Sequence, residues 1–275
     1  MSLALLDRPT TTLVRSVDRA LDLLKALERA RSPMGVSELG RSAGIPKATA
    51  QRLLAALELR GFVEKERGRY QLGAAVVALA DAFLAGNSLT RASLPVLEEL
   101  VASTGETASL YVRQGFDRVV VQRVHSPHPL RYILRIGQRL PLHLGASGQL
   151  LSAAMDEDEL LRYLDRIGEI RLATGERLSK PDFLAKLARA RERGFALSFG
   201  ERDSGVVSVA APVLREREHA RGVDVPSGMF TVHGGTVAAV GVTGPRVRMT
   251  PEKVDQVIQA VRRAADQIAD SHGRW

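Results

Sequence analysis

Short helical repeats of apolar residues near the start of the chain give its clearest pattern. Residues 16–27 carry an apolar stripe that follows Ser16, a residue type suited to cap the N-terminus of a helix. The stripe consists of Val17, Leu21, Leu24 and Leu27. Residues 37–44 form a second, shorter repeat, and Gly44 is suited to end it because glycine readily adopts the left-handed conformation. The pattern therefore predicts two helices.

A third helix is predicted directly after this turn. Pro46 favours a helix start because its ring fixes a backbone angle of the first turn. The apolar positions that follow form a stripe of Ala50, Leu53, Leu54 and Leu57. The exposed side chains near the N-terminal end of this helix are Lys47, Ala48, Thr49, Gln51 and Arg52. Two short helices around a tight turn form a helix-turn-helix, in which the second helix reaches the edges of DNA bases.

The segment after the third helix alternates as a β-hairpin does. Residues 62–72 alternate around Arg67-Gly68, after Gly61 has ended the helix. Arg67 and Arg69 suit contacts to phosphate, which position a protein on DNA without reading its sequence. Three helices and a hairpin predict a winged helix over residues 15–73, with a generic helical hairpin and merely solvated basic side chains as the alternative. The DNA contacts predicted for the winged helix are Ser37, Lys47, Ala48, Thr49, Gln51, Arg52, Arg67 and Arg69.

The segments that flank this region differ from it and from each other. Residues 1–14 have little periodicity and are predicted to be a mobile tail. Residues 74–87 are predicted to be a linker built on an apolar helix over residues 74–85. The residues of this helix that are candidates for packing are Val77, Leu79, Ala80, Phe83 and Leu84. The linker therefore separates the winged helix from the rest of the chain.

The remaining residues, 88–275, predict a second domain of mixed class. Asn87 or Ser88 caps its first helix, and Gly105 ends that helix. Strands are predicted over residues 107–113, 117–124, 130–136, 206–214 and 236–243, and further helices over residues 147–155, 158–164, 180–193 and 251–270. Helices flanking a largely antiparallel sheet indicate an α+β fold, of a kind that senses ligands.

Composition narrows these predictions. A chain of 275 residues is long enough for two domains with separate cores. The net charge is +8, and residues 1–72 hold 13 basic against 8 acidic residues, as an electrostatic footprint for DNA requires. This support is modest, because 33 of the 39 basic residues are arginine, which coding bias explains equally well.

Other features of the composition exclude classes of site and location. The chain has no cysteine, which excludes disulfides and thiolate zinc sites. It begins without the apolar run of a signal peptide, so a cytoplasmic protein is expected. The most apolar stretches, residues 73–86 and 234–244, fall short of the roughly 20 residues that span a bilayer, so no membrane span is expected.

The order of several short motifs resembles the IclR family of transcriptional regulators. The motifs are Val17-Asp-Arg-Ala-Leu-Asp-Leu-Leu, Tyr70-Gln-Leu-Gly, Gly137-Gln-Arg-Leu-Pro-Leu-His143, Ala146-Ser-Gly-Gln149, Arg193-Gly-Phe-Ala196, Gly205-Val, Ala210-Ala-Pro-Val213 and Ala238-Ala-Val-Gly-Val-Thr-Gly-Pro245. The resemblance implies an N-terminal winged helix, a linker helix and a C-terminal GAF-like domain that binds a small organic effector. It also implies a homodimer or homotetramer.

The resemblance places an effector pocket on defined positions of the second domain. The matching positions are Ala146, Ser147, Ser198, Ser208, Gly241 and Thr243. Their chemistry is compatible, because backbone N–H groups at a helix start attract a carboxylate and nearby hydroxyls can orient it. An apolar wall is predicted from Leu134, Ile136 and Leu142. The alternative is that residues 145–148 are only a close-packed loop with an N-cap.

Three features depart from the family pattern. Ser198 stands near a position where the family commonly has an acidic residue, and Gln149 stands where it often has lysine. Residues 215–235 form a 21-residue connection between two strands expected to be adjacent, far longer than a hairpin loop of roughly 2 to 5 residues. This connection is a lid, an oligomer contact or a passive insertion, of which we favour the last.

No motif for catalysis or cofactor binding is present in the sequence. The phosphate-binding, dinucleotide-binding and nucleophile-elbow motifs are absent. His125, His128, His219 and His233 do not form a metal-ligand spacing, and His143 is expected to support the pocket loop. No cofactor or metal is therefore expected.

The sequence thus predicts a non-enzymatic, ligand-responsive transcriptional regulator. It is expected to bind a partly palindromic operator in double-stranded DNA and to sense a small organic acid. One alternative is an enzyme fused to a DNA-binding domain, with Ser147, Ser198 or Ser208 as nucleophile and His143 as base. Another is a protein that binds DNA without sequence preference.

Overall fold

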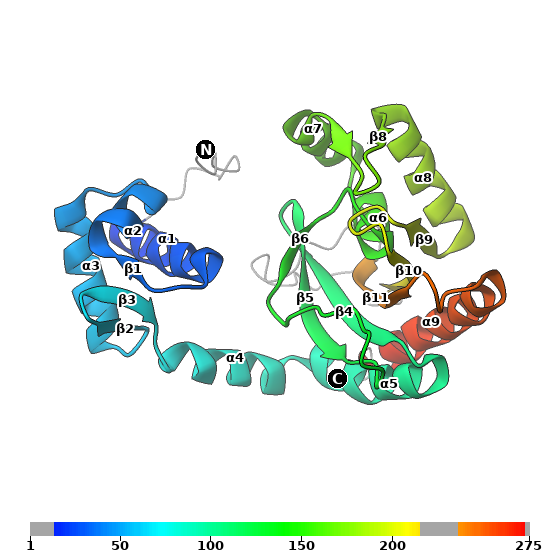
Figure 1. Ribbon diagram of the computed structural model, residues 1–275, viewed down its shortest axis with the longest axis horizontal. Coiled ribbons are helices and arrows are strands. Elements are labelled where there is room, and N and C mark those ends of the chain that lie inside the picture. The colour runs from blue at the N-terminus through cyan, green and yellow to red at the C-terminus, as the bar shows by residue number, and fades with distance from the viewer. Residues whose placement is uncertain (1–13, 215–235, 273–275) are drawn as a thin grey trace, which may run out of the picture. The chain divides into compact units, whose positions relative to one another are not determined.

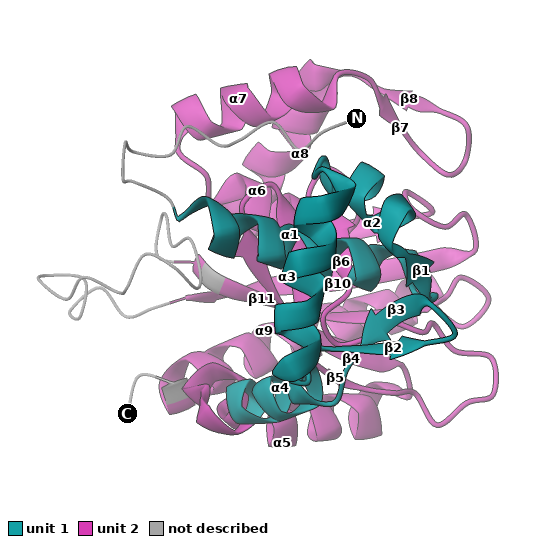
Figure 2. Ribbon diagram, turned by 90° about the vertical axis from the view of Figure 1, so that its left-hand side faces the viewer, with its two compact units in different colours: residues 1–84 teal, residues 85–275 magenta. Residues whose placement is uncertain are grey.

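The chain forms two compact units, each with its own core. The computed structural model describes residues 14–214 and 236–272 (Figure 1). Unit 1 comprises residues 1–84 and unit 2 comprises residues 85–275 (Figure 2). Within the described ranges, no helix has the length and apolar character needed to cross a membrane.

Unit 1 is a helix-turn-helix with a small sheet. Its helices are α1 (Arg15–Ala30), α2 (Val36–Ala43) and α3 (Lys47–Leu59), and its strands are β1 (Met34–Gly35), β2 (Val63–Glu66) and β3 (Arg69–Leu72). The strands are antiparallel in the order β1-β3-β2. Gly44 ends α2 in the left-handed conformation, with φ 66°, and Ala50 and Leu54 of α3 are fully buried. The predicted helix-turn-helix and hairpin are therefore confirmed.

The buried stripe of α1 differs from the predicted one. Val17 and Leu21 are 56% and 48% exposed, whereas Leu23, Ala26 and Leu27 are buried. The helix begins at Arg15, and Ser16 does not cap it. The reason lies in tertiary packing, because α2, α3 and β3 all contact α1 on the side of Leu23, Ala26 and Leu27. A stripe offset by a few residues satisfies the same helical period.

Helix α4 (Ala75–Gly86) is apolar but contains no buried residue. Val77, Leu79 and Ala80, which are candidates for packing, are exposed and therefore do not pack within the single chain. Phe83 and Leu84 are half-buried. An isolated apolar helix satisfies the same periodicity as a packed one, so the sequence pattern could not distinguish them.

Unit 2 is a six-stranded antiparallel sheet covered by helices on both faces. The strands run in the order β6-β5-β4-β11-β10-β9. Their bounds are β4 (Thr107–Gln114), β5 (Asp117–Val124), β6 (Arg139–Pro141), β9 (Ala196–Phe199), β10 (Val206–Leu214) and β11 (Thr236–Pro245). Helices α5 (Ser88–Thr104) and α9 (Pro251–His272) pack together against one face, and α6 (Ala146–Ala153) packs against the other (Figure 1). The α+β fold is therefore confirmed.

The remaining elements of unit 2 extend the layer that contains α6. They are α7 (Glu157–Ile167), α8 (Lys180–Arg193) and the two-stranded ribbon of β7 (Ile170–Arg171) and β8 (Arg177–Leu178). Helix α8 packs on α6, and Phe183 and Leu187 of α8 are fully buried. The sheet and these added elements together enclose the start of α6.

One predicted strand of unit 2 is wrong. Residues 130–136 form no strand, and the third strand of that antiparallel series is the shorter β6. Side chains hold the segment instead of a backbone ladder: the hydroxyl of Thr107 donates to the Tyr132 carbonyl (3.2 Å), and Arg248 donates to the Leu130 carbonyl (2.9 Å). An extended segment can alternate in sequence without pairing, which is why the pattern resembled a strand.

Strands β10 and β11 are adjacent, as expected. They pair from Val206 opposite Pro245 to Leu214 opposite Thr236. The connection between them, residues 215–235, lies outside the described residues, as do residues 1–13 of the predicted tail. The pairing of β10 with β11 therefore extends to the residues on either side of this connection.

Candidate functional site

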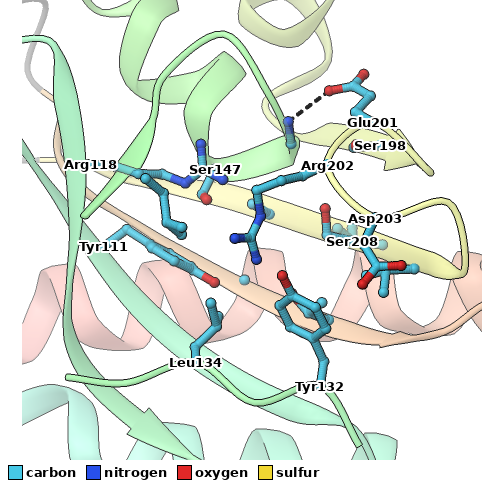
Figure 3. A pocket seen from close by; sticks show the side chains of 17 residues that line it. Tyr111, Arg118, Tyr132, Leu134, Ser147, Ser198, Glu201, Arg202, Asp203 and Ser208 are labelled. Carbon is cyan, nitrogen blue, oxygen red and sulfur yellow. Dashed lines mark hydrogen bonds between the residues drawn. The ribbon is translucent and has the colours of Figure 1, made fainter. Parts of the chain in front are cut away.

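A cavity opens on the α6 face of the sheet in unit 2, bounded by the start of α6 and by the loops around residues 132 and 202 (Figure 3). It is lined by Tyr111, Arg118, Tyr132, Leu134, Leu140, Gly145, Ser147, Ser198, Glu201, Arg202, Asp203, Val206, Ser208, Val209, Ala210, Gly241 and Thr243. The cavity volume is about 40 Å³, which is room for about three water molecules. An organic ligand would therefore have to displace side chains at the wall.

The sheet contributes a row of hydroxyl groups to this face. Ser198 of β9 pairs with Ser208 of β10, Ser208 pairs with Thr243 of β11, and Thr243 pairs with Thr107 of β4. Directly opposed residues in an antiparallel sheet project to the same face. The register therefore aligns four hydroxyl-bearing residues across four strands, and three of them line the cavity.

The neighbouring row across the sheet consists of small residues. Its members in register are Ala196, Ala210, Gly241 and Ser109. Small side chains leave space above a sheet, whereas the next row contains the large ring of Tyr111, which pairs with Ala239. The cavity therefore lies over the small-residue row and is bounded by this ring.

The start of α6 already holds a carboxylate from the chain itself. Oε2 of Glu201 accepts a hydrogen bond from the backbone N–H of Gly145 (2.7 Å). Oε1 accepts hydrogen bonds from Nε2 of Gln149 (3.0 Å) and Nζ of Lys186 (2.7 Å). The backbone N–H of Ala146 donates to the Ser208 hydroxyl at 3.4 Å. An intramolecular carboxylate therefore occupies much of the helix start at which a ligand was predicted.

Arg118 is a buried cation at the edge of the cavity. Its Nη1 donates to the backbone carbonyls of Pro141 and Leu144, and its guanidinium lies 5.8 Å from the ring centroid of Tyr111. Its Nε is buried without a hydrogen-bond partner, and no carboxylate of the described chain forms an ion pair with it. Burial lowers the pKa of Arg118 to about 10. The guanidinium therefore remains charged near neutral pH, and the nearby carboxylate of Glu201 offsets its charge only in part, without an ion pair.

Arg202 projects into the cavity from the loop between β9 and β10. Its guanidinium lies 5.1 Å from the ring centroid of Tyr132, and it points between Tyr111 and Tyr132 (Figure 3). Burial lowers the pKa of Arg202. Among residues 14–214 and 236–272, no hydrogen bond or ion pair engages its guanidinium. Its donors are therefore available to a ligand.

His143 and Tyr163 support the loop that leads into α6. The Tyr163 hydroxyl oxygen accepts from the His143 backbone N–H (2.8 Å) and lies 2.7 Å from His143 Nδ1. Burial lowers the pKa of His143, and the charge of Arg118 lowers it further. Burial raises the pKa of Tyr163 above its ordinary value. Tyr163 thus contacts both the backbone and the ring of His143, and this pair supports the loop that leads into α6.

The structure brings together most of the residues predicted for the effector pocket. Those that line the cavity are Leu134, Ser147, Ser198, Ser208, Gly241 and Thr243. Ala146 and Leu142 are buried beside it, and Leu142 belongs to the hydrophobic core. Ile136 does not line the cavity, because it lies in a turn and is 43% exposed. The turn rotates Ile136 out of the alternation that Tyr132 and Leu134 follow.

Sequence reasoning missed the charged and aromatic residues of the cavity. Tyr111, Arg118, Tyr132 and Arg202 all line it. An arginine within the valine-rich segment that forms β5 was an available signal for Arg118, since an unpaired charge is unusual in such a strand. Tyr132 and Arg202 come from irregular segments, where periodicity gives no orientation.

The predicted DNA contacts lie on the surface of unit 1. The exposed residues among them at the start of α3 are Lys47, Ala48, Gln51 and Arg52, and Thr49 is half-buried. Ser37 in the first turn of α2 is also exposed. Arg67 is at the tip of the hairpin, with a side chain that is 92% exposed. These residues are accessible to a duplex.

Arg69 has a different environment from Arg67. Its Nε and Nη2 donate to the carbonyl of Pro33 (2.9 and 2.6 Å), and Nη2 lies 3.4 Å from Oε2 of Glu38. These bonds attach the hairpin to the segment before α2. Arg69 therefore has a structural role, in addition to the phosphate contact predicted for it.

In the part of the chain that the structure describes, no cluster of three or more His, Asp or Glu side chains is arranged to hold a metal ion. His125 directly follows β5, and His128 lies further along the same loop. His219 and His233 fall outside the described residues.

Comparison with known proteins identifies both units. Residues 16–67 match the IclR helix-turn-helix domain, and residues 82–228 match the C-terminal domain of the bacterial transcriptional regulator IclR. The glycerol operon regulatory protein of Streptomyces griseus is 33% identical, over 94% of this chain and 97% of that protein. The transcriptional repressor IclR of Escherichia coli is 28% identical, over 96% of this chain and 92% of that protein.

Solved structures agree with this relationship. The crystal structure of an IclR-type regulator from Silicibacter sp. TM1040 has 29% identity and a TM-score of 0.78, covering 94% of this chain and 96% of that one. An Alicyclobacillus acidocaldarius regulator has the same fold at 24% identity, with a TM-score of 0.81, covering 95% of this chain and 100% of that one. The chain therefore belongs to the IclR family of ligand-responsive, DNA-binding transcriptional regulators.

Proposed function

We propose that this regulator binds a specific operator through α3 and the hairpin, and that a small organic acid bound in the cavity of unit 2 changes its operator affinity. The observation that carries the effector class is the guanidinium of Arg202, which lies in the cavity close to a row of hydroxyl groups and forms no ion pair with a carboxylate of the described residues. Charges withdrawn from water are costly unless they are paired. A carboxylate supplies that pairing.

The chemistry around Arg202 suits a carboxylate. A guanidinium binds a carboxylate through two parallel hydrogen bonds, and the hydroxyls of Ser198, Ser208 and Thr243 are positioned to orient the rest of the molecule. A homologue from Microbacterium hydrocarbonoxydans was crystallised with 4-hydroxybenzoate, a hydroxy acid of the class proposed here. Tyr111 and Tyr132 supply aromatic walls that such an acid would contact.

The DNA-binding half of the proposal rests on the exposed start of α3. The residues assigned to base edges or adjacent phosphates are Lys47, Thr49, Gln51 and Arg52, and Arg67 is assigned to phosphate. A homodimer or homotetramer would present two such helices to a partly palindromic operator. Effector binding can change operator affinity only if the effector binds one of two states of the protein, competent or incompetent for DNA binding, more tightly than the other. This difference in effector binding is typically about 1 to 3 kcal/mol.

A first experiment tests specificity and response together. Fragments of sheared genomic DNA that bind the protein at physiological salt are selected, with and without each member of a panel of small organic acids. Enrichment of one inverted repeat, altered by one acid, is the expected result. Uniform enrichment of all fragments would instead indicate binding without sequence preference.

A second experiment tests the assigned residues. The variant K47A/T49A/R52A is expected to lose affinity for the selected operator while keeping its helical content, because Lys47 and Arg52 are exposed and Thr49 is only half-buried. The matched control is Lys25→Ala, since Lys25 is exposed on α1. Arg202→Gln is expected to bind the operator but not to respond to the acid. Unchanged operator affinity in the triple variant would refute the assignment of α3.

A further inference from the structure

The cavity contains two arginines, and each lies against a different tyrosine. Arg118 lies beside Ser147 with its guanidinium 5.8 Å from the Tyr111 ring centroid, and Arg202 lies 5.1 Å from that of Tyr132 (Figure 3). Both side chains line the same cavity. The cavity therefore presents two positive charges at two positions.

The acidic residues near these charges, Glu201 and Asp203, offset them in part but form no hydrogen bond or ion pair with either guanidinium in the described part of the chain. Glu201 forms an ion pair with Lys186 (2.7 Å) and accepts hydrogen bonds from Gly145 and Gln149, so its carboxylate is already satisfied. Asp203 is exposed at the rim and accepts only the N–H of Gly205 (3.2 Å). Solvent screens an exposed carboxylate, so it offsets little of the charge inside.

Arg118 is held in place by hydrogen bonds but forms no ion pair with a carboxylate of the described chain. The carbonyls of Pro141 and Leu144 accept from Nη1 and fix the position of the guanidinium, yet carbonyl dipoles do not remove a full charge. A side chain at Gly148 would collide with Nη1, so the start of α6 leaves this space to the guanidinium. The described chain thus keeps a 4% exposed arginine without an ion-pair partner at the wall of a cavity.

We propose that the effector carries two acidic groups, one compensated by Arg118 and the other by Arg202, so that small dicarboxylates are its chemical class. This inference rests on the proposed function, because it assumes that the cavity is the effector site. Each guanidinium presents forked donors that match a carboxylate. A monoacid would leave one of the two charges without a partner.

The test compares molecules of the same shape that differ by one charge. Binding to the full-length protein is measured by isothermal titration calorimetry with malonate, succinate, glutarate and phthalate, and with the half-amide of each. The expected result is that one diacid binds and that its half-amide binds at least about tenfold more weakly, since a hydrogen bond to a charged group is lost. The ratio of the two affinities is the quantity that reports the second charge.

Variants assign the two charges to residues. Arg118→Gln and Arg202→Gln are each expected to bring the ratio of diacid to half-amide affinity close to one. The matched control is Arg162→Gln, because Arg162 is exposed on α7 and does not line the cavity. If Arg118→Gln does not fold, as judged by circular dichroism, Arg118→Lys keeps the charge and is expected to retain the preference for the diacid.

The outcomes separate this inference from the proposed function. A half-amide or a simple monoacid that binds as tightly as any diacid would overturn the dianionic effector and leave the organic-acid proposal standing. If no acid of either kind binds and a neutral compound releases the operator, both proposals fail. A diacid preference that survives both glutamine variants would likewise overturn the assignment to Arg118 and Arg202.

Discussion

At the scale of single residues, the start of α6 is organised around the Arg118 guanidinium. The backbone of Gly148 packs directly against Nη1 of Arg118 and the carbonyl of Leu142. Glu201 fixes the same turn from another side through Gly145 and Gln149. Two opposite charges thus meet one helix start, and each is held by different backbone groups.

Substitution of Gly148 tests this close approach. Gly148→Ala would place a methyl group within collision distance of Arg118 Nη1 and the Leu142 carbonyl. We expect it to lower the free energy of unfolding by about 1 to 3 kcal/mol, the usual cost of overpacking. Thermal unfolding followed by circular dichroism measures the change. Gly86→Ala is the control, because no atom lies within 4 Å of the added carbon. Equal midpoints in both variants would contradict the argument.

The lowered pKa of His143 is expected to make the stability of the folded protein depend on pH. Burial lowers the pKa of His143 in the folded protein below the ordinary value of about 6.5. As the pH falls through that value, the unfolded chain takes up a proton that the folded protein does not, so stability decreases. We expect His143→Gln to flatten the decrease in unfolding midpoint between about pH 7.5 and 5.5. The exposed His128 provides the control variant His128→Gln, and an equal flattening there would count against His143.

At the scale of elements, the hairpin of unit 1 gives its two arginines different environments, although the sequence predicts a phosphate contact for both. Glu66 pairs with Arg69, so Arg67 and Gly68 form a two-residue turn in which both have positive φ, 49° and 78°. Such turns match the twist of the strands, and glycine suits the second position. The turn places Arg67 in solvent, whereas Arg69 returns along β3 to Pro33.

The two arginines are expected to respond differently to alanine substitution. Arg69→Ala loses hydrogen bonds to Pro33 and should destabilise unit 1 by about 1 kcal/mol, the usual net value of such bonds. Arg67→Ala should leave stability nearly unchanged but reduce the slope of log affinity against log salt by about 0.9, as loss of one phosphate contact does. Fluorescence anisotropy with operator DNA at several salt concentrations measures the slope. The reverse assignment of the two effects would refute this division of roles.

At the scale of the whole molecule, a buried ion pair joins distant parts of unit 2. Glu106 precedes β4 and accepts from Nε and Nη2 of Arg248 (2.5 and 2.7 Å) in the segment between β11 and α9. Nη2 of Arg248 also donates to the carbonyl of Leu130, close to the segment with Tyr132 and Leu134. One side chain therefore connects the C-terminal region, the sheet and a wall of the cavity.

Breaking this pair is expected to affect stability and ligand binding together. Glu106 is 2% exposed, so Glu106→Gln leaves Arg248 without its charge partner. We expect a loss of about 2 kcal/mol of unfolding free energy, less than for a fully buried pair because Arg248 is partly exposed. Denaturant unfolding measures the loss, and weaker effector binding should accompany it. Glu98→Gln, at an exposed position on α5, is the matched control. Full stability in Glu106→Gln would rule out the structural role.

Much of the fold was predictable because it depends on near neighbours in the chain. The turn at Gly44 and the hairpin around Arg67-Gly68 follow from local backbone preferences. Helical and strand periods predicted the bounds of α8, β5 and β10 as the structure has them. The buried face of α1 and the exposure of α4 were not predictable, because a helical period fits any rotation and any degree of burial.

The residues of the candidate cavity were likewise predictable only in part. The sequence by itself determined most of the helices and the longer strands, the small and hydroxyl-bearing residues of those strands, and membership of the DNA-binding family, since each depends on local periods or on short motifs in a fixed order. Only the tertiary structure decided which charges meet. Arg118 and Arg202 lie far apart in the chain, and Glu201 forms its ion pair with Lys186 rather than with either arginine. Electrostatic compensation depends on distances in space, and these are set by sheet register and loop paths rather than by periodicity.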